Sequence, residues 1–182
     1  MCEKKYGSLK KYDDCIFICL GTGVGGAVFL DGKLLKPKNY SGFELGHVII
    51  KENGLKCSCG NRGCLQSYCS MKALKQKVAK KKGIKEISGK ELYKILKDNM
   101  ESVQDIVDEF VKDLSLALSN YINIFEPEAI ALGGSFAYCE ELLLDKIINS
   151  LKTSKMTFNE SIPEIIIAEY ANDAGIIGAT LI

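Results

Sequence analysis

The distribution of apolar residues near the N-terminus predicts three short β-strands. Residues 15–20 are almost wholly apolar, as in a central strand that is buried on both faces. Two further short runs, 26–30 and 33–35, follow closely. Asp31 and Gly32 between them are typical of a two-residue hairpin turn, because a type I′ turn needs positive φ at both positions. The glycines that precede the second run would then join one strand directly to the next.

The middle of the chain has the periodicity of helices. From Ser67 apolar residues recur at helical spacing, and we expect this helix to end near Gly83. Ser88 is typical of a helix N-cap, since Glu91 completes a capping-box pattern. A longer apolar stripe predicts a helix over residues 102–124, which a Glu-Pro pair ends.

The C-terminal part of the chain alternates between strands and helices. Residues 129–132 predict a buried strand, 133–135 a turn and 136–151 a helix. Residues 165–168 predict another strand, and 173–182 a final helix. The chain therefore ends in a strand–helix–strand–helix unit.

The order of the predicted elements indicates the fold class. Three strands come first, then an irregular excursion over about residues 36–66, then helices, giving the α/β order βββαβαβα. This order is that of a ribonuclease H-like lobe of actin-type ATPases, an identification by fold analogy. The chain has no internal repeat or low-complexity linker, and its length suits one core. We therefore interpret residues 1–182 as a single domain.

Charge and composition exclude several classes of function. Lys and Arg total 24 against 23 Asp and Glu, so no long-range field favours nucleic acid or a membrane surface. No apolar run approaches the roughly 20 residues that span a bilayer, and the N-terminus lacks the apolar stretch of a signal peptide. We therefore expect a cytoplasmic protein without membrane or nucleic-acid partners. Arg62 is the only arginine, which favours backbone amides as phosphate ligands.

A cluster of cysteines predicts a metal site. Cys57, Cys59 and Cys64 fall within eight residues, and His47 precedes them. A Cys₃His set fills the four positions of tetrahedral zinc and leaves none for a reacting water, so the pattern predicts a structural zinc ion. The alternative is a set of reduced core cysteines with an ordinary polar histidine, which the glycines and asparagine between the cysteines disfavour. The other five of the eight cysteines are interpreted as structural.

The histidine and cysteines belong to a wider set of motifs. In their order and spacing these motifs resemble the ROK family, which is named for repressors, open reading frames and kinases. The matching segments are Leu20–Gly26, Glu44–His47 (E-x-G-H), Cys57–Cys64 (C-x-C-G-x-x-G-C), Leu132–Gly134 and Asp173–Gly175. The resemblance covers essentially the whole chain, and it implies the C-terminal lobe of a glucokinase-like sugar kinase.

The resemblance also implies an N-terminal lobe that this sequence does not contain. In family members that lobe carries a first phosphate motif of D-x-G-x-T type and a catalytic aspartate in an N-D-A-N-like segment, and neither motif occurs here. Residues 3–7 resemble the helix that follows that aspartate, so we expect the chain to start just beyond it. We therefore expect no catalytic residue in this chain, with the general base upstream, and no kinase activity from the chain alone.

Two glycine turns are the expected contacts for ATP and Mg²⁺. The resemblance implies that the first turn binds phosphate, where backbone N–H groups and a threonine hydroxyl can donate, and that the second lies along the adenosine. Without the other motifs, a tight β-connection would be the preferred interpretation of the first turn. A simple strand-to-helix turn is an equal alternative for the second. The candidate residues are Gly21, Thr22, Gly23, Gly25, Gly133, Gly134 and Ser135.

The resemblance implies a sugar site around Glu44, His47 and Gln66. An ionised glutamate can accept hydrogen bonds from two adjacent hydroxyls, and a zinc-bound histidine keeps its second nitrogen for another. Zinc would thus hold the ring that contacts the sugar. Gln66 stands where the family usually carries a glutamate, and its lack of charge leaves the choice of sugar open.

Three functions are compatible with the sequence. The first is an ATP-dependent sugar kinase, with glucose as the default substrate. The second is the sugar-sensing domain of a ROK transcriptional repressor, which Gln66 mildly favours. The third is a zinc-stabilised interaction module that binds no nucleotide. Because family members commonly dimerise, the resemblance also implies a homodimer.

Overall fold

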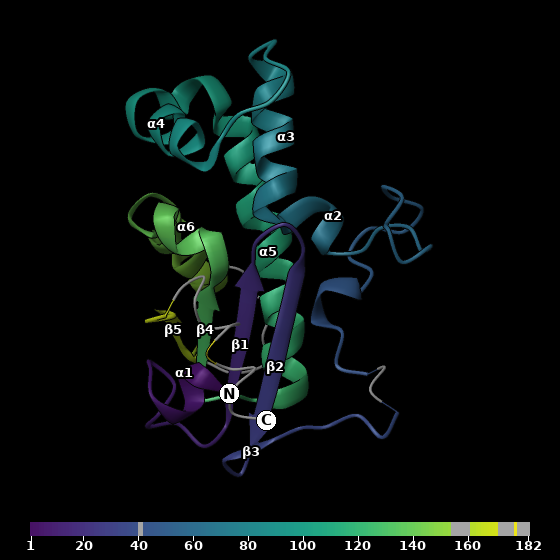
Figure 1. Cartoon of the computed structure of the whole chain (residues 1–182), viewed down its shortest axis with the longest axis vertical. Helices are drawn as coiled ribbons and strands as arrows, with labels where there is room; N and C mark the ends of the chain where they lie inside the picture. The colour runs from purple at the N-terminus through teal and green to yellow at the C-terminus, as the bar shows by residue number, and fades with distance from the viewer. Residues whose placement is uncertain (40–41, 154–160, 171–176, 178–182) are drawn as a thin grey trace.

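A mixed β-sheet forms the centre of the molecule. The computed structural model describes residues 1–39, 42–153, 161–170 and 177, and within them the sheet has five strands in the order β3-β2-β1-β4-β5 (Figure 1). The strands are β1 (Cys15–Leu20), β2 (Val24–Leu30), β3 (Lys33–Leu34), β4 (Ala129–Gly133) and β5 (Glu164–Ile167). The first three pair antiparallel, whereas β4 and β5 run parallel to β1. The carboxyl ends of β1, β4 and β5 therefore share one edge.

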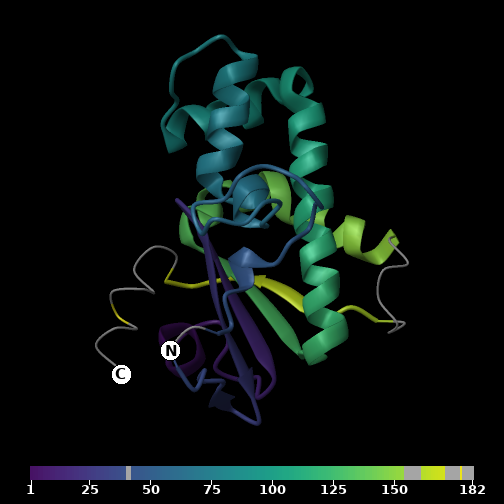
Figure 2. The ribbon, with the colours of Figure 1, turned by 90° about the vertical axis from the view of Figure 1, so that its right-hand side faces the viewer.

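Helices cover one face of the sheet and extend beyond that edge (Figures 1 and 2). The long helix α5 (Gln104–Phe125) runs along the sheet with α6 (Glu140–Thr153) packed against it. Past the end of β1 lie α2 (Gln66–Cys69), α3 (Met71–Lys81) and α4 (Gly89–Asn99). The remaining helical elements are α1 (Cys2–Lys5) and the 3-10 turns η1 (Leu45–His47), η2 (Met100–Val103) and η3 (Gly134–Cys139).

The main hydrophobic core lies between the sheet and α5. Ile16, Ile18 and Leu20 of β1 are fully buried and belong to the same cluster as Phe110 and Leu114 of α5. Alternate side chains of a strand point to opposite faces, so the rest of β1 faces away from α5. The smaller cluster there contains Leu9, Tyr12, Cys15, Phe29, Ala129 and Ala131. The strand predicted to be buried on both faces is fully buried toward α5, whereas on the other face Cys15 is buried and Phe17 and Cys19 are half-buried.

The predicted order of elements is confirmed as far as β5, with several boundaries corrected. β2 begins at Val24 rather than at residue 26, because Val24 pairs with Leu20 and only three residues remain for the turn. The single helix predicted from Ser67 is two helices. Ser70 has extended backbone (φ −68°, ψ 149°) and caps α3 by accepting a hydrogen bond from Ala73 N at 3.1 Å.

The C-terminal elements show smaller differences. The helix predicted over residues 136–151 begins at Glu140, because the chain first turns through η3. The strand predicted over 165–168 is β5, one residue earlier. The helix predicted over 173–182 lies outside the described residues except for Ile177. In the part of the chain that the structure describes, no helix is long and apolar enough to cross a membrane.

Candidate functional site

Four side chains from η1 and the cysteine segment (residues 57–64) converge at the surface. His47 Nδ1 lies 3.5 Å from Cys57 Sγ, and Cys59 Sγ lies 3.6 Å from Cys64 Sγ. All four candidate ligand atoms lie within 4.8 Å of one another. Cys57 and Cys64 are buried, His47 is half-buried and Cys59 is exposed. The sequence prediction of which residues meet here is therefore consistent with the structure.

The spacing of these atoms fits a tetrahedral zinc ion. Zinc–sulfur bonds of about 2.3 Å and zinc–nitrogen bonds of about 2.0–2.1 Å place neighbouring ligand atoms roughly 3.5–3.8 Å apart. Both measured pairs match that spacing, and a contraction of at most about 1 Å brings the other pairs to it. Three thiols and an imidazole are also the donors of a closed structural zinc site. Since Nδ1 faces the cysteines, His47 keeps Nε2 for another partner.

Burial and local hydrogen bonds separate the pKa values of the thiols. Desolvation raises the pKa of Cys64 to about 12. Burial also raises the pKa of Cys57, but hydrogen bonds with Cys59, Cys64 and Ser67 outweigh it and lower that pKa to about 5. A thiolate at Cys57 beside a protonated thiol at Cys64 is an arrangement that releases a proton when it takes up a cation.

Lys51 attaches the excursion to α5. Its Nζ lies 2.7 Å from Asp113 Oδ2, 2.9 Å from Glu109 Oε1 and 4.5 Å from the centre of the Tyr68 ring. The Tyr68 hydroxyl in turn accepts a hydrogen bond from Leu55 N at 2.6 Å. These contacts connect the residues just before the cysteines to α2 and α5.

Close packing against β2 positions η1. A Cβ atom on Gly46 would lie 1.9 Å from Val24 O, so only glycine allows this approach. On the opposite side, the Tyr121 hydroxyl of α5 donates a hydrogen bond to Leu45 O. The backbone that carries His47 is therefore held between the sheet and α5.

The two predicted nucleotide turns meet at the carboxyl edge of the sheet. The β1–β2 turn (Gly21–Gly23) follows β1, and the predicted turn at Gly133–Ser135 is the junction at which the neighbouring parallel strand β4 ends at Gly133 and η3 begins at Gly134; Ser135 Oγ donates to Leu20 O at 3.4 Å. On the other side, Lys72 N in the first turn of α3 donates to Gly21 O at 3.2 Å. Ligands of open α/β sheets commonly bind at this edge.

Gln66 lies between the β1–β2 turn and the cysteine segment. Its Oε1 accepts a hydrogen bond from Val24 N at 3.3 Å, and its Nε2 donates to Ser58 Oγ at 3.0 Å and to Cys57 Sγ at 3.5 Å. A backbone N–H can only donate, so Val24 fixes which way the amide faces. Both N–H groups and one of the two lone pairs on Oε1 are then used within the chain.

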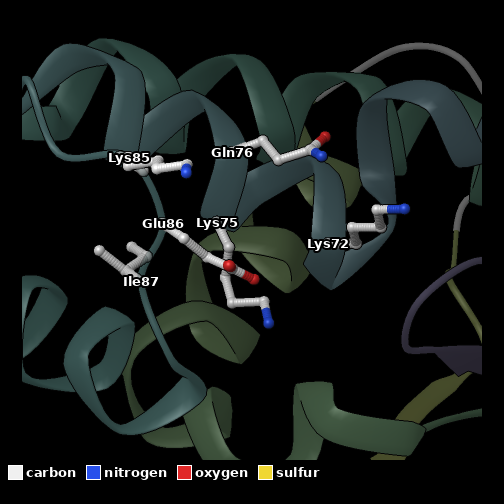
Figure 3. A pocket seen from close by; sticks show the side chains of 7 residues that line it. Lys72, Lys75, Gln76, Lys85, Glu86 and Ile87 are labelled. Atoms are coloured by element: carbon white, nitrogen blue, oxygen red, sulfur yellow. The ribbon is translucent and has the colours of Figure 1, made fainter.

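Two adjoining pockets flank the start of α3. One of about 330 Å³ lies between Thr22, the residues around the cysteine segment, α2 and α3, and includes Gln66. The second, of about 290 Å³, is lined by Lys72, Lys75, Gln76, Ala79, Lys85, Glu86 and Ile87 (Figure 3). Lys72 and Gln76 line both pockets, and the ammonium group of Lys72 points away from Lys75 and Glu86 in Figure 3. The positively charged side chain of Lys72 is therefore shared by the two pockets.

The structure groups most of the predicted site residues. The four candidate metal ligands and Gln66 form one group, and the two glycine turns form the adjoining one. Gly25 belongs to β2, not to the turn. Glu44 is exposed just before η1, and among the described residues no hydrogen bond or ion pair engages its side chain.

Sequence reasoning missed three residues of this region. Lysines recur along α3, so no pattern singles out Lys72 as the one beside the turn. Lys51 and Asp113 come from distant parts of the chain, and only the fold brings them together. The signal available for Asp113 was an acidic residue within the apolar stripe of the long helix.

Comparisons with known proteins agree with the motifs. Residues 1–182 match the profile of the ROK family. A glucokinase from Thermotoga maritima is 31% identical over 195 residues, which cover 99% of this chain and 61% of the relative. The xylose repressor of Bacillus subtilis is 32% identical over 145 residues, which cover 80% of this chain and 37% of the repressor.

A solved structure of a ROK family protein also matches this chain. A ROK family glucokinase from Streptomyces griseus, in complex with glucose and AMPPNP, matches with a TM-score of 0.87 at 26% identity over 97% of this chain and 62% of that chain. This chain therefore spans less than two thirds of the length of each of these three relatives. Its relatives include both kinases and repressors.

Proposed function

Because the chain belongs to the ROK family, we propose that it is the zinc-stabilised lobe of an ATP-dependent sugar kinase. In this proposal His47, Cys57, Cys59 and Cys64 hold zinc, which supplies stability to a segment with few buried apolar residues. ATP with Mg²⁺ supplies the phosphoryl group, and the chain contributes contacts that position nucleotide and sugar. The general base is expected outside this chain.

The observation that carries the proposal is the meeting of the two glycine turns beside a lysine. In the β1–β2 turn the Gly21 N–H donates to Gly23 O at 3.0 Å, so the N–H groups of Thr22 and Gly23 are the donors proposed for phosphate, and there is open space around Gly21. Lys72 lies next to this turn and could add a positive charge for a phosphate chain. The glucokinase with the same fold was solved with AMPPNP, which supports a nucleotide as a ligand, and we place it at this edge because ligands of open α/β sheets commonly bind there.

The polar side chains near the cysteine segment can form the hydrogen bonds that a sugar needs. Glu44 presents a carboxylate to solvent, and His47 has Nε2 available when Nδ1 faces the cysteines. Gln66 retains one lone pair on Oε1, so it can accept one hydroxyl hydrogen bond rather than two. The three predicted sugar contacts are thus of unequal strength, with Glu44 the strongest acceptor.

A sugar-sensing repressor domain is the second candidate. The similarity to the xylose repressor favours it, and so does the uncharged amide of Gln66. A sensor needs only the sugar site, whereas a kinase also needs the nucleotide. Nucleotide binding therefore separates the two functions.

Isothermal titration of the zinc-loaded chain with Mg²⁺–AMPPNP, and separately with glucose and xylose, tests the proposal. Gly21→Val should weaken AMPPNP binding at least ten-fold, because the new side chain has room in the free protein but occupies the face of the turn. Gly89→Val is the matched control, since Gly89 also has open space around it and begins α4. Sugar binding without any AMPPNP binding by the unmodified chain would contradict the kinase and support the repressor.

A further inference from the structure

The amide of Gln66 connects two parts of the site that are far apart in sequence. It accepts from Val24, which follows the β1–β2 turn, and donates to Cys57 and Ser58 in the cysteine segment. The half-buried side chain therefore forms a hydrogen-bonded bridge from a candidate metal ligand to the strand that leaves the glycine turn.

The chemistry of the bridge requires an amide. One end meets a donor, the Val24 N–H, and the other meets the Cys57 sulfur, which accepts as a thiolate when it binds a metal. A glutamine offers an acceptor and donors at once, whereas a glutamate at the same position has no N–H and would place a negative charge against the thiolate. The amide of Gln66 therefore matches the contacts at both of its ends inside this chain.

The turn is shaped around this amide as well. A Cβ atom on Gly23 would lie 2.7 Å from Gln66 Oε1, the free end of a flexible side chain. A side chain at position 23 would therefore displace the amide rather than the turn. By contrast, Gly25 has open space around it.

We infer that Gln66 is a positioning residue that couples the metal site to the β1–β2 turn. Metal held by Cys57 fixes the sulfur that receives the Gln66 N–H, and the other end of the amide then fixes the Val24 N–H at the end of the turn. A change at the metal site is thereby transmitted to the glycine turn through the side chain of Gln66. Only the consequence for phosphate binding rests on the proposed kinase function; the bridge itself does not.

The first test measures both ends of the bridge. Zinc affinity is obtained by competition with a chelating dye, and exchange of the Val24 amide hydrogen is followed by NMR. Gln66→Leu removes the N–H that Cys57 Sγ accepts and should lower zinc affinity about 10- to 100-fold, the usual effect of losing a partner of a metal ligand. Gln66→Leu should speed Val24 exchange about two- to twelve-fold, the range for one lost hydrogen bond. Gln76→Leu is the matched control, because Gln76 lines the same pocket and is exposed.

The second test approaches the bridge from the turn. Gly23→Ala should lower zinc affinity although it lies outside the metal site, whereas Gly25→Ala should leave zinc affinity unchanged. Gln66→Met serves beside Gln66→Leu if one of them folds poorly, as judged by circular dichroism. Because Val24 exchange needs no nucleotide, the bridge can be confirmed even if AMPPNP does not bind, which would contradict only the proposed function.

Two results would overturn the inference. The first is wild-type zinc affinity and Val24 exchange in both Gln66→Leu and Gln66→Met. The second is a Val24 amide whose exchange is the same in the zinc-loaded and zinc-free wild-type protein, since a purely local contact gives that result. A zinc-dependent change at Val24 that disappears in Gln66→Leu supports the coupling.

Discussion

The ion pair between Lys51 and Asp113 tests how the excursion is attached to the rest of the fold. Asp113 is only 4% exposed, and its Oδ2 lies 2.7 Å from Lys51 Nζ. Lys51→Met keeps the apolar stem of the side chain but leaves the buried carboxylate without its closest cation. Removing one partner of a buried pair costs about 3–5 kcal/mol, whereas an exposed pair contributes about 0–1 kcal/mol. Because the Lys51 side chain is 34% exposed, we expect an intermediate loss of about 2–3 kcal/mol in the free energy of unfolding.

Urea unfolding of the zinc-loaded protein, followed by circular dichroism, measures this loss. Lys51→Met/Asp113→Leu removes both charges, so most of the stability should return, to within about 1 kcal/mol of the wild type. Lys97→Met is the control, because Lys97 and Glu141 are both more than half exposed and 4.0 Å apart. The urea dependence of the unfolding free energy should stay the same in all variants.

Two outcomes would refute the reasoning. If Lys51→Met behaves like Lys97→Met, the ion pair does not stabilise the fold. If the double variant is as unstable as Lys51→Met, the loss comes from the packing of the lysine stem and not from an uncompensated buried charge.

Three further predictions concern the same region. Gly46→Ala should lower the free energy of unfolding by about 1–3 kcal/mol, because η1 must move away from β2 to make room for the methyl group. The same shift should weaken zinc binding. A wild-type unfolding free energy in urea and a wild-type zinc affinity in dye competition would contradict this prediction. Lys72→Gln should weaken AMPPNP binding and make it less salt-dependent, as titrations at two ionic strengths can show, whereas an unchanged salt dependence would exclude this cation from the phosphate site. Hydrogen bonds from Lys77 and Lys51 lower the pKa of Glu109. The ionised Glu109 side chain therefore stabilises the folded protein above its ordinary pKa of about 4.3, and this contribution is lost as pH falls through the lowered pKa. Glu109→Gln should remove that part of the pH dependence of urea unfolding.

Much of the fold could be predicted because its signals are local. The strand β1 is a continuous apolar run, and α5 carries a long apolar stripe. The capping box of α4 is present as predicted, with Ser88 Oγ accepting from Glu91 N at 3.2 Å and Glu91 Oε2 accepting from Ser88 N at 2.7 Å. The candidate metal site was also predictable, since its three cysteines are close in sequence.

The connections between elements could not be predicted in the same way. Gln66 and Val24 are 42 residues apart, and nothing in either segment shows that the amide meets this N–H. The break at Ser70 was hidden because apolar residues continue at helical spacing on both sides of it. A polar contact between distant segments depends on the final packing, and neither periodicity nor motif spacing encodes it.

The distribution of buried residues predicts how the protein responds to loss of zinc. Most of the core belongs to the sheet and the helices, whereas residues 36–66 contribute little to it. The ion pair of Lys51 with α5 and the packing of Gly46 on β2 attach that segment to the fold, and the proposed zinc ion would tie η1 to the cysteine segment. Removal of zinc should therefore speed hydrogen exchange in η1, the cysteine segment and the β1–β2 turn, while β1, β4 and α5 stay protected. Hydrogen exchange with mass spectrometry, with and without a chelator, distinguishes this local opening from cooperative unfolding. Equal loss of protection in α5 and in the cysteine segment would mean that the metal stabilises the whole domain and not only its site.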